Sequence, residues 1–440
     1  MAESTEDKAV GSEDDSASRG DEPGGDTSRS AAARGRTARH DAGSERGGAT
    51  PHDEPYQARP VKVPPYETVA LVLQGGGALG AYQAGVYQGL EEAGVVPDWI
   101  AGISIGALNT ALIAGNPPER RLARLIEFWD LICTPAYGIS VPSGLEQALF
   151  NASDFVRKGF TTWQAMQTVL EGQKGFFVPR MPPPSPLSKR DPTTASWYDT
   201  RALKATLERM CDFDRINDGG IRVSIGAVNV KTGNFAYFDN TKQRLRAEHF
   251  MASGALPPGF AAVEIDGEYY WDGGLMSNTP LTRVLQTTPR RDTLAFQVDL
   301  WSALGPVPDN LTDVTGRQKD IQYSSRTRMV TDMLQRSQRF RHVLHEVLSR
   351  VPPEVRETDH WCRVAEELAC GKRYNVIHLI YQAKEYDGHF KDFQFGHATM
   401  REHWQTGLID TRATLEHPDW LDFPDNEAGF VTHDVHRDDR

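Results

Sequence analysis

Two long uncharged runs, both rich in glycine, constrain the fold of this chain more than any other feature of its sequence. Residues Val69–Leu90 and Trp99–Pro118 contain no Asp, Glu, Lys or Arg, and each run is long enough to resemble a membrane span. The first run contains six glycines, however, and the second ends in Gly115-Asn116-Pro117-Pro118. Glycine at this density and a terminal Asn-Pro-Pro turn favour buried strand–turn–helix units over membrane helices.

Each run begins as a short apolar strand and continues as a helix. Thr68–Leu73 is rich in β-branched residues, which predicts a buried strand, and helical spacing follows over residues 75–94. Trp99–Ile103 leads in the same way into a helix over Ala107–Ala114. Two successive strand–helix units predict an α/β fold with a mostly parallel central sheet and helices packed on it.

Further strands and helices are predicted along the rest of the chain. Alternating residues on both sides of Lys231-Thr232-Gly233 indicate a β-hairpin, and the prolines of 179–186 interrupt a segment of mixed character over 138–194. The additional strands are expected at Ile221–Val230, Asn234–Phe238, Glu264–Asp272, Thr293–Leu300 and, as a lone strand, Asn375–Tyr381. The additional helices are expected at Glu119–Ile132, Tyr198–Asp212, Leu311–Arg350 and Thr399–Leu415.

The first 60 residues differ in composition from the rest of the chain. Their only large apolar residues are Met1, Val10 and Tyr56, and 13 acidic against 8 basic residues give the segment a net charge of −5. Such a segment cannot bury enough apolar surface to offset its ordering entropy, so 1–62 is predicted to be disordered. It has no basic region followed by an apolar one and does not resemble a secretion signal.

Charge and cysteine content exclude two classes of ligand. The formal net charge of the whole chain is −12, which argues against nucleic acid as a partner. The cysteines form no Cys-x-x-Cys pair, and together with His360 and His378 they match no common zinc spacing, so we expect no metal. Scattered cysteines of this kind are typical of a reducing compartment. The four are Cys133, Cys211, Cys362 and Cys370.

A glycine-rich turn follows the first predicted strand. In Gly75-Gly76-Gly77-Ala78-Leu79-Gly80 several backbone N–H groups converge at the start of a helix, where an anion or an oxyanion is stabilised. The same residues fit the Gly-x-Gly-x-x-Gly fingerprint of dinucleotide binding. That fingerprint expects an acidic residue at the end of the second strand, whereas Asp98 precedes the second strand, so nucleotide binding is the weaker interpretation.

Two further motifs contain potential catalytic groups. Gly102-Ile103-Ser104-Ile105-Gly106 lies between a strand and a helix, as a nucleophile elbow does, although an ordinary turn with a capping serine has the same pattern. Asp272 leaves a predicted strand into Gly273 and Gly274. A carboxylate held at a strand end can act as the base for a serine without a histidine, although Asp-Gly-Gly alone is more often a plain turn.

In this order, the three motifs resemble those of the patatin-like phospholipases, and the resemblance extends over roughly Tyr66 to Leu304. It implies a three-layer α/β fold in which Ser104 is the nucleophile and Asp272 completes a Ser-Asp dyad. The implied oxyanion hole consists of Gly75, Gly76 and Gly77. The remaining motif glycines are Gly80, Gly102, Gly106, Gly273 and Gly274, and further matches to the family lie at 197–200, 214–217 and 252–260.

The resemblance implies cleavage of lipid esters, of the phospholipase A or lysophospholipase type, through an acyl-serine and without metal or cofactor. Many relatives have Arg or Lys where this chain has Leu79, so a phospholipid head group is less firmly indicated than ester cleavage. Two alternatives remain open. One is an α/β-hydrolase that uses His378 or His389 in a Ser-Asp-His triad, and the other is a non-catalytic module that binds lipid or a partner.

The resemblance divides the chain into an acyl hydrolase domain at 66–304, a mainly helical region at 311–421 and a polar tail at 422–440. Within the helical region, residues 315–350 contain eight basic and three acidic residues. This stretch is interpreted either as a peripheral contact to anionic lipid or as a solvated helix packed on the hydrolase domain. In both cases Met329, Val330, Met333 and Leu334 are expected to turn inward. We expect a cytoplasmic protein, and no pattern indicates its oligomeric state.

Overall fold

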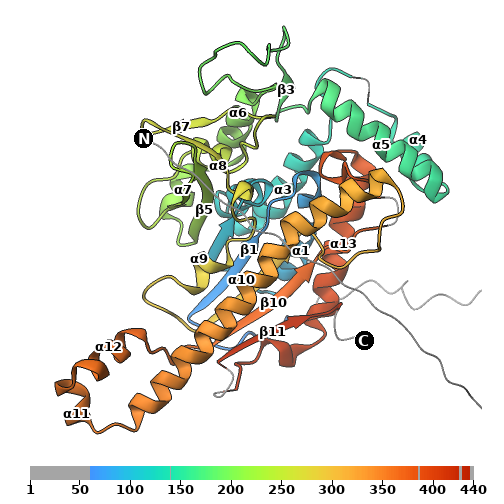
Figure 1. Cartoon of the computed structure of the whole chain (residues 1–440). Coiled ribbons are helices and arrows are strands. Elements are labelled where there is room, and N and C mark those ends of the chain that lie inside the picture. Colours follow the sequence, from blue (N-terminus) through green and yellow to red (C-terminus); the bar gives the residue numbers. More distant parts are fainter. Residues whose placement is uncertain (1–59, 139, 385–386, 426–428, 437–440) are drawn as a thin grey trace, which may run out of the picture. The chain divides into compact units, whose positions relative to one another are not determined.

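A central sheet of nine strands organises the part of the chain that this computed structural model describes, namely residues 60–138, 140–384, 387–425 and 429–436 (Figure 1). The strand order is β11-β10-β9-β1-β2-β5-β8-β7, and β6 pairs with β5. From β11 to β5 neighbouring strands are parallel, whereas β6, β8 and β7 are antiparallel to their partners. The predicted α/β fold with a mostly parallel sheet is confirmed.

Apart from β7, β8 and β11, the strands of this sheet lie close to the predicted ranges. They are β1 (Thr68–Leu73), β2 (Trp99–Gly102), β5 (Arg222–Asn229), β6 (Phe235–Asp239), β7 (Val263–Ile265), β8 (Glu268–Asp272), β9 (Thr293–Asp299), β10 (Tyr374–Ile380) and β11 (Phe430–Asp434). Two short strands, β3 (Val178–Pro179) and β4 (Tyr198–Asp199), pair with each other. The predicted disorder over 1–62 falls almost entirely on residues outside the described ranges.

Helices cover both faces of the sheet. The α-helices are α1 (Ala81–Glu92), α2 (Ile105–Ala114), α3 (Pro118–Ile132), α4 (Ser143–Phe150), α5 (Asp154–Glu171), α6 (Arg201–Met210), α7 (Phe213–Asp218), α8 (Ala247–Ser253), α9 (Leu281–Leu285), α10 (Leu311–Ser349), α11 (Pro353–Thr358), α12 (His360–Leu368) and α13 (His397–Leu415). Short 3₁₀ helices are η1 (Gly77–Gly80), η2 (Gly273–Leu275), η3 (Lys391–Phe393) and η4 (Pro418–Leu421). Among the described residues, no helix combines the length and the apolar character that a membrane crossing needs.

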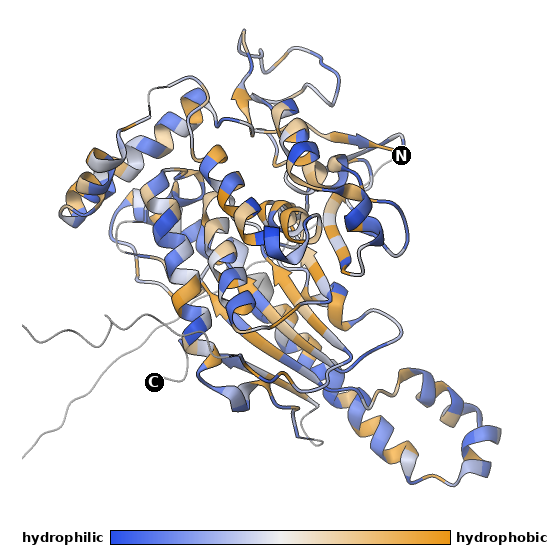
Figure 2. Cartoon of the chain, turned by 180° about the vertical axis from the view of Figure 1, so that it is seen from behind, coloured by the Kyte–Doolittle hydropathy of each residue, from blue (hydrophilic) through white to orange (hydrophobic). Residues whose placement is uncertain are grey.

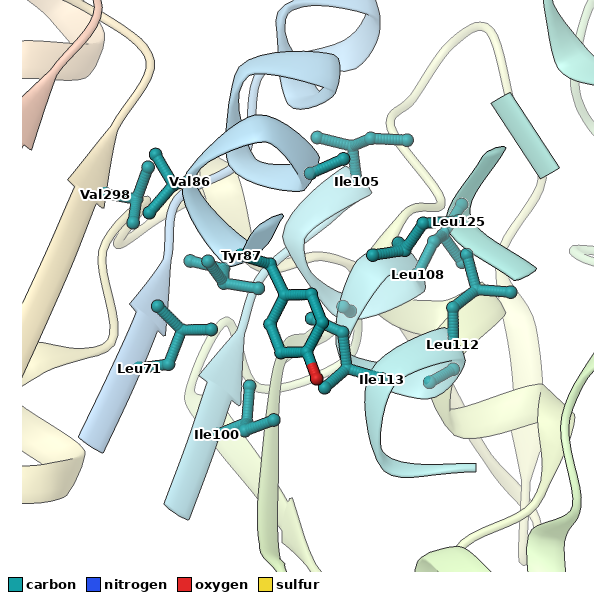
Figure 3. Close-up of a cluster of buried hydrophobic side chains, with 14 of the residues drawn as sticks. Leu71, Val86, Tyr87, Ile100, Ile105, Leu108, Leu112, Ile113, Leu125 and Val298 are labelled. Carbon is teal, nitrogen blue, oxygen red and sulfur yellow. The ribbon is translucent and has the colours of Figure 1, made fainter. Parts of the chain in front are cut away.

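The two faces of the sheet have separate cores because side chains alternate along each strand. Leu71 and Leu73 of β1 lie in the larger core, with residues of α1, α2 and α13, whereas Ala70 and Val72 lie in a smaller core with residues of α9 and α10. Figure 3 shows part of the larger core, where Leu71 and Ile100 of the strands lie beside the helical side chains. Hydrophobic residues predominate along the central strands in Figure 2, as expected for strands buried on both faces.

The C-terminal region contributes to the same sheet, which corrects two expectations. The strand predicted to stand alone, β10, pairs with β9 on one side and with β11 on the other. Residues 430–434, predicted to belong to a polar tail, form β11, and its first residue, Phe430, is 2% exposed. This short and mostly polar segment is a strand because it pairs with β10. The local sequence does not reveal that partner.

Two further segments differ from their predictions. The single strand expected over Glu264–Asp272 is a hairpin of β7 and β8, because Asp266 and Gly267 both adopt positive φ, at 52° and 83°. An Asp-Gly pair is a signal for such a turn. The segment of mixed character contains helices α4 and α5.

Helix α10 confirms the helix predicted over Leu311–Arg350, but its apolar residues do not all turn inward. Leu334 is 3% exposed and packs in the smaller core beside Val330, whereas Met329 and Met333 are 67% and 49% exposed. The inward orientation predicted for the two methionines is therefore wrong, because the face of α10 toward the sheet is offset from them around the helix.

Candidate active site

Ser104 lies on the sharp turn between β2 and α2. Its backbone has φ 55° and ψ −124°, a conformation that L-residues rarely adopt, and it is the residue that precedes the first turn of α2. The turn is tight because glycine stands on both sides. A Cβ on Gly102 would lie 2.4 Å from the carbonyl oxygen of Gly106, and a Cβ on Gly106 would lie 2.4 Å from that of Leu73. This strained geometry is typical of a nucleophile elbow.

The backbone of Ser104 is fastened to strand β5. Its N–H donates to Ser253 Oγ at 2.9 Å, and Ser253 Oγ donates in turn to the carbonyl oxygen of Gly226 at 2.6 Å. Since β5 lies between β2 and β8, the same strand also positions Asp272, whose Cα is paired with that of Ala227. Ser253 was not among the predicted site residues, although it lies within the family match at 252–260.

Asp272 lies at the end of β8 and is 2% exposed. Burial raises its pKa from 3.8 to about 7, and hydrogen bonds from the Ser104 side chain and from the Gly274 N–H oppose this rise in pKa. The Gly274 N–H lies 2.7 Å from Asp272 Oδ1. The structure therefore brings together Ser104 and Asp272, which are 168 positions apart in the sequence.

The glycine-rich turn supplies free backbone donors beside Ser104. Within the described ranges, the amides of Gly76 and Gly77 donate to no other group of the chain, whereas the amide of Gly75 donates to the Asn278 carbonyl oxygen at 3.3 Å. Gly77 has φ 58°, and a Cβ there would lie 2.3 Å from the carbonyl oxygen of Asp392. Two unused N–H groups, at Gly76 and Gly77, thus border the cavity that contains Ser104.

Two side chains hold the first peptide of this turn in place. The carbonyl oxygen of Gly75 accepts hydrogen bonds from Asn278 Nδ2 and from Trp301 Nε1, both at 2.9 Å. Because a trans peptide is planar, fixing this carbonyl also fixes the direction of the Gly76 N–H. Trp301 follows the carboxyl end of β9, and α/β sheets bind ligands at that edge. Its position after a predicted strand could therefore have identified Trp301 as a site residue from the sequence.

The cavity beside Ser104 has a volume of about 90 Å³ and a mainly apolar wall. Aromatic rings dominate this wall, and two of them, Phe177 and Phe260, are 5.1 Å apart. Four wall residues come from the C-terminal region, where no sequence motif pointed to the site. They are Tyr323 of α10, Asp392 and Phe393 of η3, and Phe395.

The other residues considered from the sequence lie away from this cavity. His378 has its Nδ1 3.8 Å from Asp299 Oδ2, and both His378 and His389 line other cavities, so no described histidine borders that of Ser104. Asp98 bonds to the Val69 N–H at the opposite end of the strands from the glycine turn. Leu79 is fully buried in the larger core. Among the described residues, no three metal-binding side chains gather in one place.

Comparison with known proteins identifies the family. A family model described as Patatin-like phospholipase matches residues 71–285, and a second, described as Patatin phospholipase, matches residues 321–427. Patatin-like phospholipase domain-containing protein 6 of Homo sapiens is 36% identical over 104 residues, which is 23% of this chain and 7% of that protein. Lysophospholipase nte1 of Aspergillus terreus is 60% identical over 47 residues, 11% of this chain and 3% of that protein.

Among solved structures, VipD from Legionella pneumophila is similar at 13% identity and a TM-score of 0.35, covering 84% of this chain and 72% of that one. Human GIVD cytosolic phospholipase A2 is similar at 12% identity and a TM-score of 0.35, with coverages of 80% and 60%. The sequence matches span less than a tenth of each curated relative named above. Two family models with patatin descriptions lie in succession along the sequence, and the chain belongs to the patatin-like phospholipase family.

Proposed function

We propose that this chain hydrolyses lipid esters, with Ser104 as the nucleophile and Asp272 as its base. The observation that carries the proposal is that Ser104 and the buried Asp272 line the same mainly apolar cavity, where the Ser104 side chain lowers the pKa of the Asp272 carboxyl against the effect of burial. A buried carboxylate that accepts the serine proton can activate the hydroxyl without a histidine. Membership of the patatin-like phospholipase family supports a lipid ester as the substrate class.

In the first half of the reaction, Asp272 takes the Ser104 proton while Oγ attacks the acyl carbonyl carbon. The tetrahedral intermediate carries a negative oxygen, which the free amides of Gly76 and Gly77 stabilise. The bond to the alcohol then breaks, the proton passes from Asp272 to the departing alkoxide, and an acyl-serine is left. The hydrogen bonds from Asn278 and Trp301 to Gly75 hold the Gly76 amide ready for this charge.

In the second half, water replaces the alcohol. Asp272 takes a proton from the water as it attacks the acyl-serine, and the same amides stabilise the second tetrahedral intermediate. Collapse of that intermediate releases the fatty acid and returns the proton to Ser104. Every proton transfer in both halves uses a group of the protein, the substrate or water.

For the substrate we propose the phospholipase A or lysophospholipase type, because relatives named as lysophospholipase and patatin-like phospholipase match parts of this chain. The aromatic wall is suited to an acyl chain. We further propose a cytoplasmic protein that meets lipid peripherally. The interpretation of 315–350 as a contact to anionic lipid stays a prediction, and two of its bases are used internally, Arg317 on the Ala303 carbonyl and Lys319 on Asp392.

A fluorophosphonate probe that reacts with activated serines tests the proposal. Wild-type protein should be labelled once, and Ser104→Ala should lose both the label and at least about a thousandfold of ester hydrolysis. Asp272→Asn should lose about a hundredfold or more, because it keeps the nucleophile and removes the base. Ser277→Ala, a serine in the loop after Asp272, is the matched control and should label normally.

Three results would count against this assignment. Labelling that persists in Ser104→Ala would exclude Ser104 as the nucleophile. Activity that falls with His378→Ala or His389→Ala would favour the Ser-Asp-His alternative, and a wild-type protein without label or hydrolysis would favour a non-catalytic module.

A further inference from the structure

Helix α5 exposes most of its large apolar side chains to solvent, and three of the five residues that it buries are polar. The buried residues are Phe160, Thr161, Gln164, Ala165 and Thr168. Gln164 Nε2 donates to Glu146 Oε1 of α4 at 3.0 Å. A surface helix normally shows the opposite arrangement, with its apolar side buried. The outward side therefore calls for a separate explanation.

The outward side of α5 is a continuous apolar stripe. At 100° per residue its members fall within an arc of ~140°, and the only other residues in that arc are Gly159 and Thr162. No charged side chain lies in the arc. The α5 stripe consists of Phe155 (89% exposed), Val156 (38%), Trp163 (47%), Met166 (54%), Val169 (37%) and Leu170 (71%). Contiguous exposed apolar surface of this kind marks an interaction site.

The C-terminal end of the α5 stripe adjoins the wall of the Ser104 cavity. The carbonyl oxygen of Val169 accepts a hydrogen bond from Tyr198 Oη at 2.7 Å, and the Tyr198 ring lies 5.0 Å from that of Phe177, which lines the cavity. On the inner side of α5, Gln164 packs against Gly396, the neighbour of the cavity residue Phe395. Helices α4 and α5 lie side by side, away from the central sheet (Figure 1). The stripe and the cavity are thus joined by one layer of side chains.

We propose that the α5 stripe docks on a lipid surface and holds the Ser104 cavity against it. The inference rests on the proposed function, since an acyl-ester cavity needs the lipid that supplies the ester. A helix with aromatic and aliphatic side chains on one face binds in the plane of a membrane interface, with that face in the acyl region. Because the stripe is uncharged, apolar burial supplies the affinity, and neutral lipid suffices. This separates the α5 stripe from the basic stretch at 315–350.

Vesicle binding in the Ser104→Ala background tests the proposal without any catalytic readout. The parent protein should bind phosphatidylcholine vesicles, and adding Trp163→Gln, Met166→Gln and Leu170→Gln should weaken the partitioning at least about tenfold. Raising sodium chloride from about 0.05 to 0.5 M should leave binding by the parent unchanged, because no charge pairs are involved.

The matched control carries Met329→Gln, Met333→Gln and Phe340→Gln, which remove three exposed apolar side chains from α10. This control should bind vesicles like the parent. Circular dichroism melts check that both triple variants are folded. If the α5 triple variant does not fold, the parent and its Trp163→Phe variant are compared instead. Their difference fluorescence should shift to shorter wavelength on vesicles if Trp163 enters lipid.

Three outcomes would overturn the proposal. The first is α5-variant binding equal to that of the parent, and the second is equal loss in the α10 control. The third is a dimer in light scattering that the α5 substitutions dissociate, which would make the stripe a subunit interface. Failure of the proposed function is distinguishable, because it would appear as persistent labelling of Ser104→Ala and would not change vesicle binding.

Discussion

At the scale of single residues, the proposed base Asp272 is deeply buried, although it must be ionised to accept the proton of Ser104. Asp272 is 2% exposed, and this burial raises its pKa to about 7. A carboxylate with an ordinary pKa would be charged at neutral pH but would be a weaker base. The raised pKa places Asp272 near the point where protonated and ionised forms are equally populated in neutral solution.

Hydrolysis should therefore rise with pH through neutrality. Asp272 can take the Ser104 proton only when it is ionised, so kcat/KM for a short soluble ester should increase about tenfold per pH unit below the midpoint and level off above about pH 7. A pH series with purified protein measures this. A profile that is flat between pH 5 and pH 8 would contradict the assigned role.

Thermal melts provide an independent control for the same pKa. Between about pH 4 and pH 7 the folded protein holds a proton on Asp272 that the unfolded chain has released, so ionisation destabilises the fold as pH rises. Asp272→Asn carries no such cost. The melting temperature of Asp272→Asn minus that of the wild type should therefore increase from pH 4 to pH 8. A difference that stays constant over this range would mean that the carboxyl is not buried as described.

At the scale of elements, the closest helix contact joins the first and last long helices of the described chain. Helices α1 and α13 cross where each has a glycine, and their backbones pack in close contact there. A Cβ on Gly85 would lie 1.8 Å from the Trp404 carbonyl oxygen, and one on Gly407 would lie 2.1 Å from that of Tyr82. Beside the crossing, the Tyr82 hydroxyl donates to Asp410 Oδ2 at 2.7 Å. This contact orients the helix that follows the glycine-rich turn.

Gly407→Ala should destabilise the protein by about 1–3 kcal/mol, because the added methyl group meets backbone that cannot move aside. Gly159→Ala in α5 is the matched control, since a Cβ there meets nothing within 4 Å. Alanine favours helix over glycine, so the control should gain up to about 1 kcal/mol. Urea unfolding measures both, and equal changes in the two variants would contradict the close crossing.

At the scale of the whole molecule, the C-terminal region completes both the sheet and the cavity. Strand β9 lies between β1 and β10, so removing the C-terminal region would leave β9 as an exposed edge. It would also uncover the face of α1 that packs on α13 and remove Phe393 and Phe395 from the cavity wall.

A chain that ends at residue 310 should therefore fail to fold, as measured by circular dichroism and by soluble yield. The matched control replaces 353–368 with a short Gly-Ser linker, since α11 and α12 contain no buried residue. This control should keep a cooperative melt. A folded and active 1–310 chain would show that the boundary predicted near residue 304 separates independent domains.

Local signals account for what the sequence predicted well. Glycine placement identified the turns after β1 and β2, and with them Ser104 and the free amides, because these features depend on neighbours in sequence. Long-range pairing explains the failures. Nothing near Tyr374–Ile380 indicates that β10 lies beside β9, and nothing near Phe393 indicates that it lines the cavity. The Asp266-Gly267 turn was a local signal that the prediction overlooked.

The position of β9 has a consequence for how such a protein can change over generations. The two segments matched by separate family models share one sheet and one cavity wall. A gene rearrangement that separates them would therefore leave each product with an incomplete sheet and an incomplete cavity wall. The unpaired edge of β9 could then form hydrogen bonds with strands of other chains, which leads to aggregation. Both segments must therefore stay in one chain for the sheet and the cavity to form.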